Sequence, residues 1–520
     1  MTDVPVFYFT AEKNQCFLIK DPIPGSSRPY SSSATAQKSA QTSTREMDLC
    51  WETCVRASKL LQVRELYGNV IPFKKRKRNF KEEFRKIQVS QPVVWKYSET
   101  DKIADGALEK IHVDVQTPEG LTETDALLTG GANGSLSFVE VGKVRPHFDY
   151  EVKCMPDRAW PFIKENQAEY GTIPGPIRRS ARGSLRMGSD VSCIKLFGKQ
   201  STTIENDSSI RDALVSNLGS ETSRGSLSIV KLIEPLDLDW SFPATHRRMR
   251  DVASFNCTIW TADCNFNWSR AVIGTNLGAA LVDLETGDAS WVCRSKSDVF
   301  ALQFIHSGNA LLCGLRDGAI VTVDVREKRE GSSAALISHI PYSSSDKTLG
   351  SSSRQVFELF GNIYPSYTVK MPSSISCLVS LQFDDHYFLA SSMDGSVKLY
   401  DHRLIQRGAV QSYEGHVNSR TRIQLAVDPS DKFVMSGGED CKLRIWSIKT
   451  GELLFEDKFS NSVPSTVCWH RAERLLGVQD ETQWYKECIH QQGYGLKAWL
   501  GSHKGLFYMD WSGIYSDALM

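Results

Sequence analysis

Hydrophobic and polar residues follow two different patterns along the chain. Between Arg45 and Tyr67, apolar residues recur at spacings of three and four, which predicts an amphipathic helix that ends near Gly68. Beyond about residue 90 this spacing disappears, and short β-branched or aromatic runs alternate with polar residues between Gly, Asn, Asp and Ser turns. The sequence therefore predicts one helix near the start of the chain and an all-β body.

One β pattern recurs five times: small residues, a polar turn that usually contains Gly, and an alternating strand that closes near an Asp. The copies are LLTGGANGSLSFVEVG (127–142), VIGTNLGAALVDLETG (272–287), LLCGLRDGAIVTVDVRE (311–327), FLASSMDGSVKLYDHR (388–403) and FVMSGGEDCKLRIWSIKTG (433–451). The aligned residues Val282, Val323, Tyr400 and Trp446 lie 41, 77 and 46 residues apart. We interpret the long step as one repeat plus a Ser-rich insertion at 329–372.

This period and these turns resemble the WD40 repeat, in which each repeat supplies one four-stranded blade of a β-propeller. In a WD40 blade a His, a Ser or Thr, an Asp and a Trp hydrogen-bond in series and fix the strands to the turn. The best copy has all four at suitable spacing: His416, Ser436, Asp440 and Trp446. Cys441 stands where the turn usually has Gly. The resemblance implies a seven-bladed propeller over residues 90–515.

Residues 1–89 are expected to form an N-terminal arm, which is partly disordered. Residues 23–45 are rich in Ser, Thr and Ala and cannot bury enough apolar surface to offset chain entropy. The predicted helix at 45–67 would pack on its own propeller or on a partner, and both interpretations stay open. The arm also holds five consecutive cations, which favour nuclear import: Lys74, Lys75, Arg76, Lys77 and Arg78. We therefore expect a nuclear protein that is also present in the cytoplasm.

Two of the repeat copies end in Asp, any residue, Arg. They are Asp324 with Arg326, and Asp401 with Arg403. This ending resembles the Trp-Asp-x-Arg ending by which WD40 substrate receptors dock onto the adaptor of cullin-4 RING ubiquitin ligases, although neither copy has the Trp. The resemblance implies that each Asp supports its Arg and that each Arg contacts the adaptor. The alternative is a local ion pair at the end of a strand.

A closer resemblance covers Val410 to Ile448 and the opening Phe7-Tyr8-Phe9. These segments are similar to the cullin-4-associated factor 4 family of WD40 proteins. The resemblance implies a non-catalytic substrate receptor that links target proteins to a cullin-4 RING ligase. Its partners would be the adaptor, from the damaged-DNA-binding protein family, and through it cullin-4. The sequence does not identify the target.

Composition narrows the function further. Lys plus Arg and Asp plus Glu are both 61, so no overall field draws the protein to nucleic acid or to an acidic membrane. No segment approaches the ~20 apolar residues of a membrane helix, and Asp3 stands where a signal peptide would be basic. The 13 Cys are irregularly spaced, which is typical of reduced thiols. We expect an intracellular protein without a membrane partner.

The chain has none of the common catalytic motifs. Phosphate loops, nucleophile elbows and His-Glu-x-x-His are all missing from the sequence, so we expect neither an enzyme nor a cofactor. Cys468 with His470, and Cys488 with His490, have the residue types that bind zinc. Their Cys-x-His spacing is poor for a metal site in alternating strands, and we expect no metal.

Two other functions remain open from the sequence. The first is a WD40 scaffold in a nuclear or ribosome-assembly complex, which needs no Asp-x-Arg endings. The second is a chromatin or nucleic-acid binder that uses residues 74–78 as an electrostatic arm, with binding that falls steeply with salt.

Overall fold

The computed structural model describes most of the chain from residue 76 onward and parts of the arm. The described residues are 7–10, 15–18, 59–66, 68–73, 76–117, 120–141, 151–161, 173–180, 184–198, 210–232, 236–237, 248–265, 267–305, 308–326, 336–337, 357–361, 363, 367–471 and 495–511. The Ser-rich stretch 23–45 and the residues Lys74, Lys75, Cys488 and His490 lie outside them. The chain divides into two compact units, residues 1–80 and 81–520, each described by itself.

The first unit contains two hairpins and a helical segment. Strand β1 (Phe7–Thr10) pairs with β2 (Gln15–Leu18), and β3 (Val70–Phe73) pairs with β4 (Arg76–Asn79). Residues 59–66 are helical, which confirms the described part of the helix predicted at 45–67.

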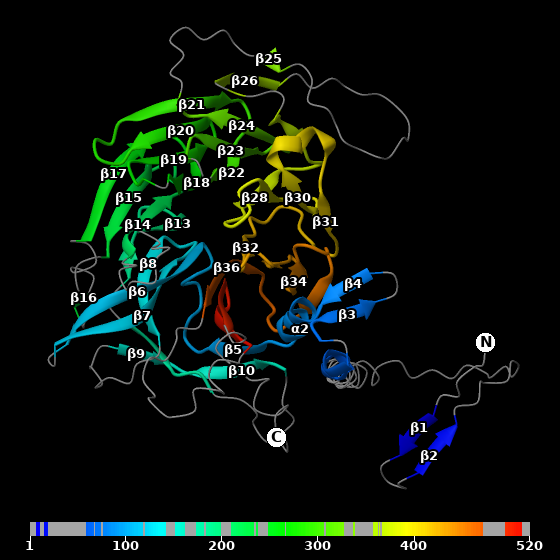
Figure 1. The fold of residues 1–520 in the computed structure, drawn as a ribbon. Coiled ribbons are helices and arrows are strands. Elements are labelled where there is room, and N and C mark those ends of the chain that lie inside the picture. The colour runs from blue at the N-terminus through cyan, green and yellow to red at the C-terminus, as the bar shows by residue number, and fades with distance from the viewer. Residues whose placement is uncertain are drawn as a thin grey trace, which may run out of the picture. The chain divides into compact units, whose positions relative to one another are not determined.

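The second unit is a seven-bladed β-propeller, as the repeat pattern predicts (Figure 1). Its first three sheets in chain order have these strands. The first contains β6 (Ala107–Thr117), β7 (Gly120–Gly130), β8 (Ser135–Val141), β9 (Glu151–Cys154), β11 (Ile177–Ser180), β12 (Leu185–Arg186) and β16 (Leu236–Asp237). The second contains β13 (Val191–Gly198), β14 (Ile210–Asn217), β15 (Gly225–Lys231) and β17 (Met249–Phe255). The third contains β18 (Ile259–Cys264), β19 (Arg270–Thr275), β20 (Gly278–Asp283), β21 (Ala289–Ser295), β25 (Leu336–Ile337) and β26 (Phe357–Gly361).

The other four sheets complete the ring. The fourth contains β22 (Val299–Phe304), β23 (Ala310–Leu315), β24 (Ala319–Asp324) and β27 (Val369–Lys370). The fifth contains β28 (Ile375–Ser380), β29 (Tyr387–Ser392), β30 (Val397–Asp401) and β31 (Gln411–Tyr413). The sixth contains β32 (Leu425–Val427), β33 (Phe433–Gly437), β34 (Leu443–Ser447) and β35 (Leu453–Asp457). The last contains β36 (Pro464–Arg471), β37 (Leu496–Ser502), β38 (Gly505–Asp510), β5 (Val93–Tyr97) and β10 (Pro156–Trp160).

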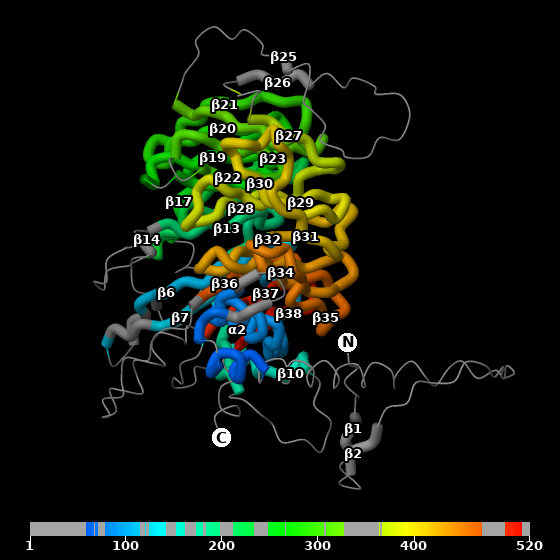
Figure 2. Tube along the Cα trace, turned by 45° about the vertical axis from the view of Figure 1, so that its right-hand side comes forward, coloured from blue at the N-terminus to red at the C-terminus, as the bar shows by residue number. Residues whose placement is uncertain are grey.

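The last blade is built from both parts of the propeller chain. Strand β5 pairs antiparallel with β38, with Trp95 opposite Tyr508, so a strand near residue 95 completes a sheet near residue 508. Both views show this early segment beside the C-terminal strands (Figure 1 and Figure 2). The sequence placed residues 90–145 in one blade of their own. The structure instead puts β5 in the last blade, because its buried face needs the edge of β38.

A helix that the sequence analysis missed precedes this strand. Helix α2 spans Phe80–Val89, and Phe80, Ile87 and Val89 are buried. Its residues from Lys81 onward fall within the propeller unit, although we expected the arm to extend to residue 89. The buried residues repeat at helical spacing, but the preceding run of cations obscures this short apolar pattern.

The core lies between neighbouring blades, where side chains from facing sheets pack together. Fully buried residues there include Trp446 and Trp499. The turn between the second and third strands needs a left-handed residue, and Gly318 and Gly395 adopt φ values of 89° and 83°. Cys441 adopts φ 63° at the equivalent turn, so a residue with a Cβ occupies a conformation that favours glycine.

The long step between repeats does contain an insertion. Between β24 and β28 the chain adds β26 to the edge of β21 in the preceding sheet, with Cys293 opposite Gly361. It then returns as β27, which pairs with β24. Within the described part of the chain, no helix is long and apolar enough to cross a membrane.

Candidate functional site

The two Asp-x-Arg endings form the same local structure. After β24, the Arg326 guanidinium lies side-on to Asp324, with Nε 3.1 Å from Oδ1 and Nη2 2.7 Å from Oδ2. The Asp324 side chain is 6% exposed and that of Arg326 is 63% exposed. The buried carboxylate therefore orients a cation that extends into solvent.

The second ending repeats this geometry. The Arg403 Nε and Nη2 atoms lie 3.1 and 2.9 Å from the two oxygens of Asp401. Asp401 also accepts a hydrogen bond from the Arg403 backbone N–H at 3.0 Å and caps a 3₁₀ helix, His402–Arg407. Hydrogen bonds from the Arg403 side chain hold the pKa of the Asp401 carboxyl below its usual range, against a smaller opposing effect of burial. The pair is bidentate, which only a guanidinium can achieve.

The two pairs lie on neighbouring blades. Residues of β24 and of β30 share one core cluster, in which Ile320 packs with residues such as Phe388 and Tyr400. Because each pair follows the third strand of its blade, both arginines belong to the same end of the sheets. The structure thus brings together the four residues that the sequence singled out for partner binding, and their binding role stays a prediction.

Two exposed apolar residues near Arg403 were missed by the sequence analysis. Leu404 follows Arg403 and is 44% exposed, and Phe383 is 73% exposed in the turn that leads into β29. The Phe383 backbone N–H donates to Asp431 at 2.6 Å, which ties this turn to the next blade. Exposed single residues carry no signal in an alternating pattern, so only the structure reveals them.

The predicted blade tetrad forms in part. His416 Nε2 donates to the Gly437 carbonyl at 2.9 Å, and Ser436 Oγ lies 3.3 Å from the same nitrogen. The buried Trp446 Nε1 donates to the Glu414 carbonyl at 2.9 Å rather than to Ser436. The indole is therefore satisfied by the backbone before the first strand.

Asp440 also departs from the expected series. Its carboxylate pairs with Arg444, whose Nη1 lies 3.0 Å away, and Arg444 Nη2 reaches Glu456 at 2.8 Å. The Arg444 side chain is only 3% exposed, so a buried cation competes for Asp440 and replaces the link that we expected. The residues sit in one blade as predicted, but the uninterrupted series is wrong.

The basic run is placed in part. Arg76, Lys77 and Arg78 lie in strand β4, paired with β3. Its role in nuclear import stays a prediction.

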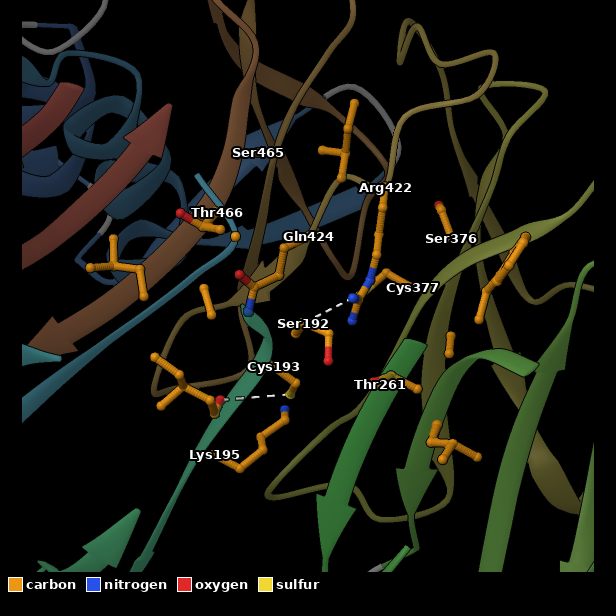
Figure 3. Close-up of a pocket in the computed structure, with 18 of the residues that line it drawn as sticks. Ser192, Cys193, Lys195, Thr261, Ser376, Cys377, Arg422, Gln424, Ser465 and Thr466 are labelled. Atoms are coloured by element: carbon orange, nitrogen blue, oxygen red, sulfur yellow. Dashed lines mark hydrogen bonds between the residues drawn. The ribbon is translucent and has the colours of Figure 1, made fainter. Parts of the chain in front are cut away.

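The sequence analysis missed a cavity in the channel of the propeller. It is lined by the innermost strand, or the residues just before it, of all seven blades, and its volume is about 90 Å³. Its wall contains many hydroxyl groups and three residues that carry charge: Glu109, Lys195 and Arg422 (Figure 3). Each residue comes from a different repeat, so no local motif could have grouped them.

Metal and thiol chemistry find no further support in the described residues. They contain no group of three or more His, Cys, Asp or Glu side chains arranged to hold a metal ion. Nine described cysteines are free thiols, including Cys193, Cys377 and Cys468 at the channel.

These features define the class of the molecule. Residues 364–401 and 408–447 match the family model described as "WD domain, G-beta repeat". The chain is a WD40-repeat β-propeller protein.

Comparison with known proteins then gives particular relatives. The chain is 30% identical over 208 residues to human "DDB1- and CUL4-associated factor 4-like protein 2", which is 39% of this chain and 44% of that protein. It is 29% identical over 160 residues to human "DDB1- and CUL4-associated factor 4", covering 31% of this chain and 26% of that protein. It is also 24% identical over 179 residues to "WD repeat-containing protein 21" of Schizosaccharomyces pombe, covering 34% of each. The resemblance stated from the sequence is thereby confirmed as homology, and the chain spans less than half the length of these relatives.

Proposed function

We propose that this protein is a non-catalytic substrate receptor that links target proteins to a cullin-4 RING ubiquitin ligase through the damaged-DNA-binding adaptor. The observation that carries this proposal is the pair of Asp-braced arginines, Arg326 and Arg403, at equivalent places on neighbouring blades. The names of two human relatives, which describe association with DDB1 and CUL4, support the choice of partner.

The geometry suits docking onto a protein surface. Each guanidinium is more than half exposed, and its conformation is fixed in advance by a buried carboxylate. Less side-chain entropy is then lost on binding than for a mobile Arg. The exposed Leu404 and Phe383 add apolar area in the same region, as interface hot spots usually require. Substrate transfer would follow from holding the target close to the ligase, since effective concentration drives such reactions.

Affinity purification from cells tests the proposal. The tagged full chain is compared with the Arg326→Ala/Arg403→Ala double variant, and mass spectrometry identifies the proteins that remain bound. We expect the adaptor and cullin-4 with the parent, and recovery reduced roughly tenfold or more with the double variant.

A matched control is available on the same blade. Arg316 is 67% exposed and pairs with Asp298 at 3.4 Å, but it lies before β24 rather than after it. Arg316→Ala should leave recovery unchanged. If the parent recovers neither adaptor nor cullin but another stable complex, the proposal fails and the scaffold role replaces it.

A further inference from the structure

The Arg422 side chain crosses the channel of the propeller. Its Nη1 donates to the backbone carbonyl of Ser192 at 2.8 Å. Arg422 precedes β32, whose blade lies between those of β28 and β36, whereas Ser192 lies in β13, between β6 and β18. The contact therefore joins blades that are not neighbours. Among the described residues, this is the one hydrogen bond of the Arg422 guanidinium, so its other N–H groups remain available in the channel.

A second cation, Lys195, enters the channel from β13. It lies three residues further along the strand than Ser192, and no described residue is within hydrogen-bond distance of its ammonium. Burial alone would lower the pKa of Lys195, but Asp263, Cys193, Glu109 and Cys377 together raise it, so the side chain stays charged. The Lys195 ammonium therefore needs hydrogen-bond acceptors that the described protein atoms do not supply.

The two cations face a common space. Cys377 projects from β28, across the channel from β13, and its thiol interacts electrostatically with both Lys195 and Arg422 (Figure 3). The Sγ atom of Cys377 accepts a hydrogen bond from Leu425 N at 3.4 Å, which fixes this wall. The cavity thus has a cation at its side, a cation across its span and hydroxyl-rich walls.

The acidic groups of the channel leave this space available for an anion. Asp263 accepts hydrogen bonds from the Phe304 backbone N–H at 2.7 Å and from Gln303 at 3.3 Å. Glu109 is in contact with Cys468, whose Sγ lies 3.8 Å from Oε2. Burial raises the pKa of Glu109 to about 7, so near neutral pH about half of this group carries no charge. The two carboxyl groups offset the two cations only in part.

We propose that the channel binds a small oxyanion, of the size of phosphate or of one carboxylate group, between Arg422 and Lys195. The forked N–H groups of Arg422 match two oxygens of such a group, and the ammonium of Lys195 supplies a point charge. The cavity volume of about 90 Å³ suits one such group and excludes a larger polyphosphate. This oxyanion site, defined by Arg422 and Lys195, does not depend on the docking role proposed above.

Isothermal titration calorimetry on the full chain tests the site with two probes. Inorganic phosphate represents a free ligand, and the peptide acetyl-Gly-Glu-Gly-amide, beside its Gln counterpart, represents an acidic side chain of a protein. We expect at least one oxyanion to bind and the Gln peptide not to bind. Which probe binds identifies the source of the oxyanion, and either result supports the site.

Two variants locate the binding. Lys195→Met keeps the length of the side chain without its charge, and Arg422→Gln shortens the bridge across the channel. Each should weaken oxyanion binding about tenfold or more, whereas Lys504→Met, at an exposed turn, should not change it. Thermal unfolding of each variant checks that the propeller is intact, and if one variant does not fold, the other decides. Failure of both probes to bind the parent protein, or equal affinity in the parent and both variants, would overturn the site.

Discussion

The indole N–H of Trp511 donates to the backbone carbonyl of Val89 at 3.0 Å, although 422 residues separate them in the chain. Trp511 follows β38, and Val89 is the last residue of helix α2. The Trp511 ring also stacks on Trp469 with centroids 5.1 Å apart. Beside the pairing of β5 with β38, this bond fastens the start of the propeller to its last blade, so the ring depends on contacts between its two ends.

Trp511 should therefore contribute more to stability than an exposed Trp. Trp511→Phe keeps an aromatic ring but removes the hydrogen bond to Val89, which should lower the free energy of unfolding by about 1 kcal/mol. Trp511→Ala also removes the buried ring and should cost about 3–5 kcal/mol. Urea denaturation midpoints provide the measurement. Trp291→Phe, at a site that is 36% exposed, is the control, and a midpoint for Trp511→Phe equal to that of Trp291→Phe would contradict the closure role.

Bracing by Asp401 should matter for partner binding separately from the charge of Arg403. Asn at position 401 can still cap the 3₁₀ helix, because Asn is as good an N-cap as Asp. It can offer only one acceptor oxygen, so the bidentate contact with the guanidinium is lost. Asp401→Asn should weaken adaptor binding in the affinity purification while leaving the thermal midpoint almost unchanged.

The outcome depends on comparison with Arg403→Ala. We expect Asp401→Asn to retain more adaptor than Arg403→Ala, since the cation remains but is no longer oriented. Full adaptor recovery with Asp401→Asn, beside loss with Arg403→Ala, would mean that the charge suffices and that the brace has no part in docking.

The sequence predicts the centre of each blade well and its edges poorly. The five repeat copies correspond to the hairpins β7–β8, β19–β20, β23–β24, β29–β30 and β33–β34. These second and third strands are buried and joined by tight turns, so both their alternation and their turn residues are visible in the sequence. Outer strands such as β17 are half exposed and vary freely. The pairing of β5 with β38 is non-local and has no signal along the chain.

The candidate sites divide in the same way. Asp401 and Arg403 are two residues apart, so a local pattern was sufficient to predict their contact. Arg422 and Ser192 are 230 residues apart, and their contact exists only because the ring closes. Arg444 was missed for a further reason, because alternation predicts that it is buried but not which carboxylate it binds.

Acid should weaken the fold through His470. Burial first, and then Lys110 and Lys497, lower the pKa of His470 to about 3, with Asp125 opposing. Since the unfolded chain binds this proton near pH 6.5, the stability is present above that pH and is lost as the pH falls toward the folded-state pKa. At pH 5 the loss amounts to about 2 kcal/mol.

Urea denaturation at pH 7.5 and pH 5 isolates this contribution. His470→Gln removes the titrating group, so the variant should lose less stability than the parent between these two pH values. His503→Gln, at an exposed position, should follow the parent protein. Identical pH dependence in the parent and His470→Gln would show that His470 does not couple folding to protonation.

Oxyanion binding in the channel should depend on pH through Glu109. The charged groups that face this carboxyl are Lys195 on β13 and the Cys468 thiol on β36, and burial outweighs their effect, so that the pKa of Glu109 lies near 7. A bound anion disfavours the ionised carboxylate and favours the protonated form, which can also donate a hydrogen bond. Binding should therefore take up a proton, and affinity should rise as the pH falls from 8 to 6, by about tenfold if the bound form is fully protonated. Sulfate is the suitable probe for calorimetry because its charge is constant over this range. Glu109→Gln imitates the protonated group, so the variant should bind sulfate at pH 8 as tightly as the parent does at pH 6, with little dependence on pH. A parent affinity that does not change with pH, or a Glu109→Gln variant that keeps the full pH dependence, would exclude Glu109 from the site.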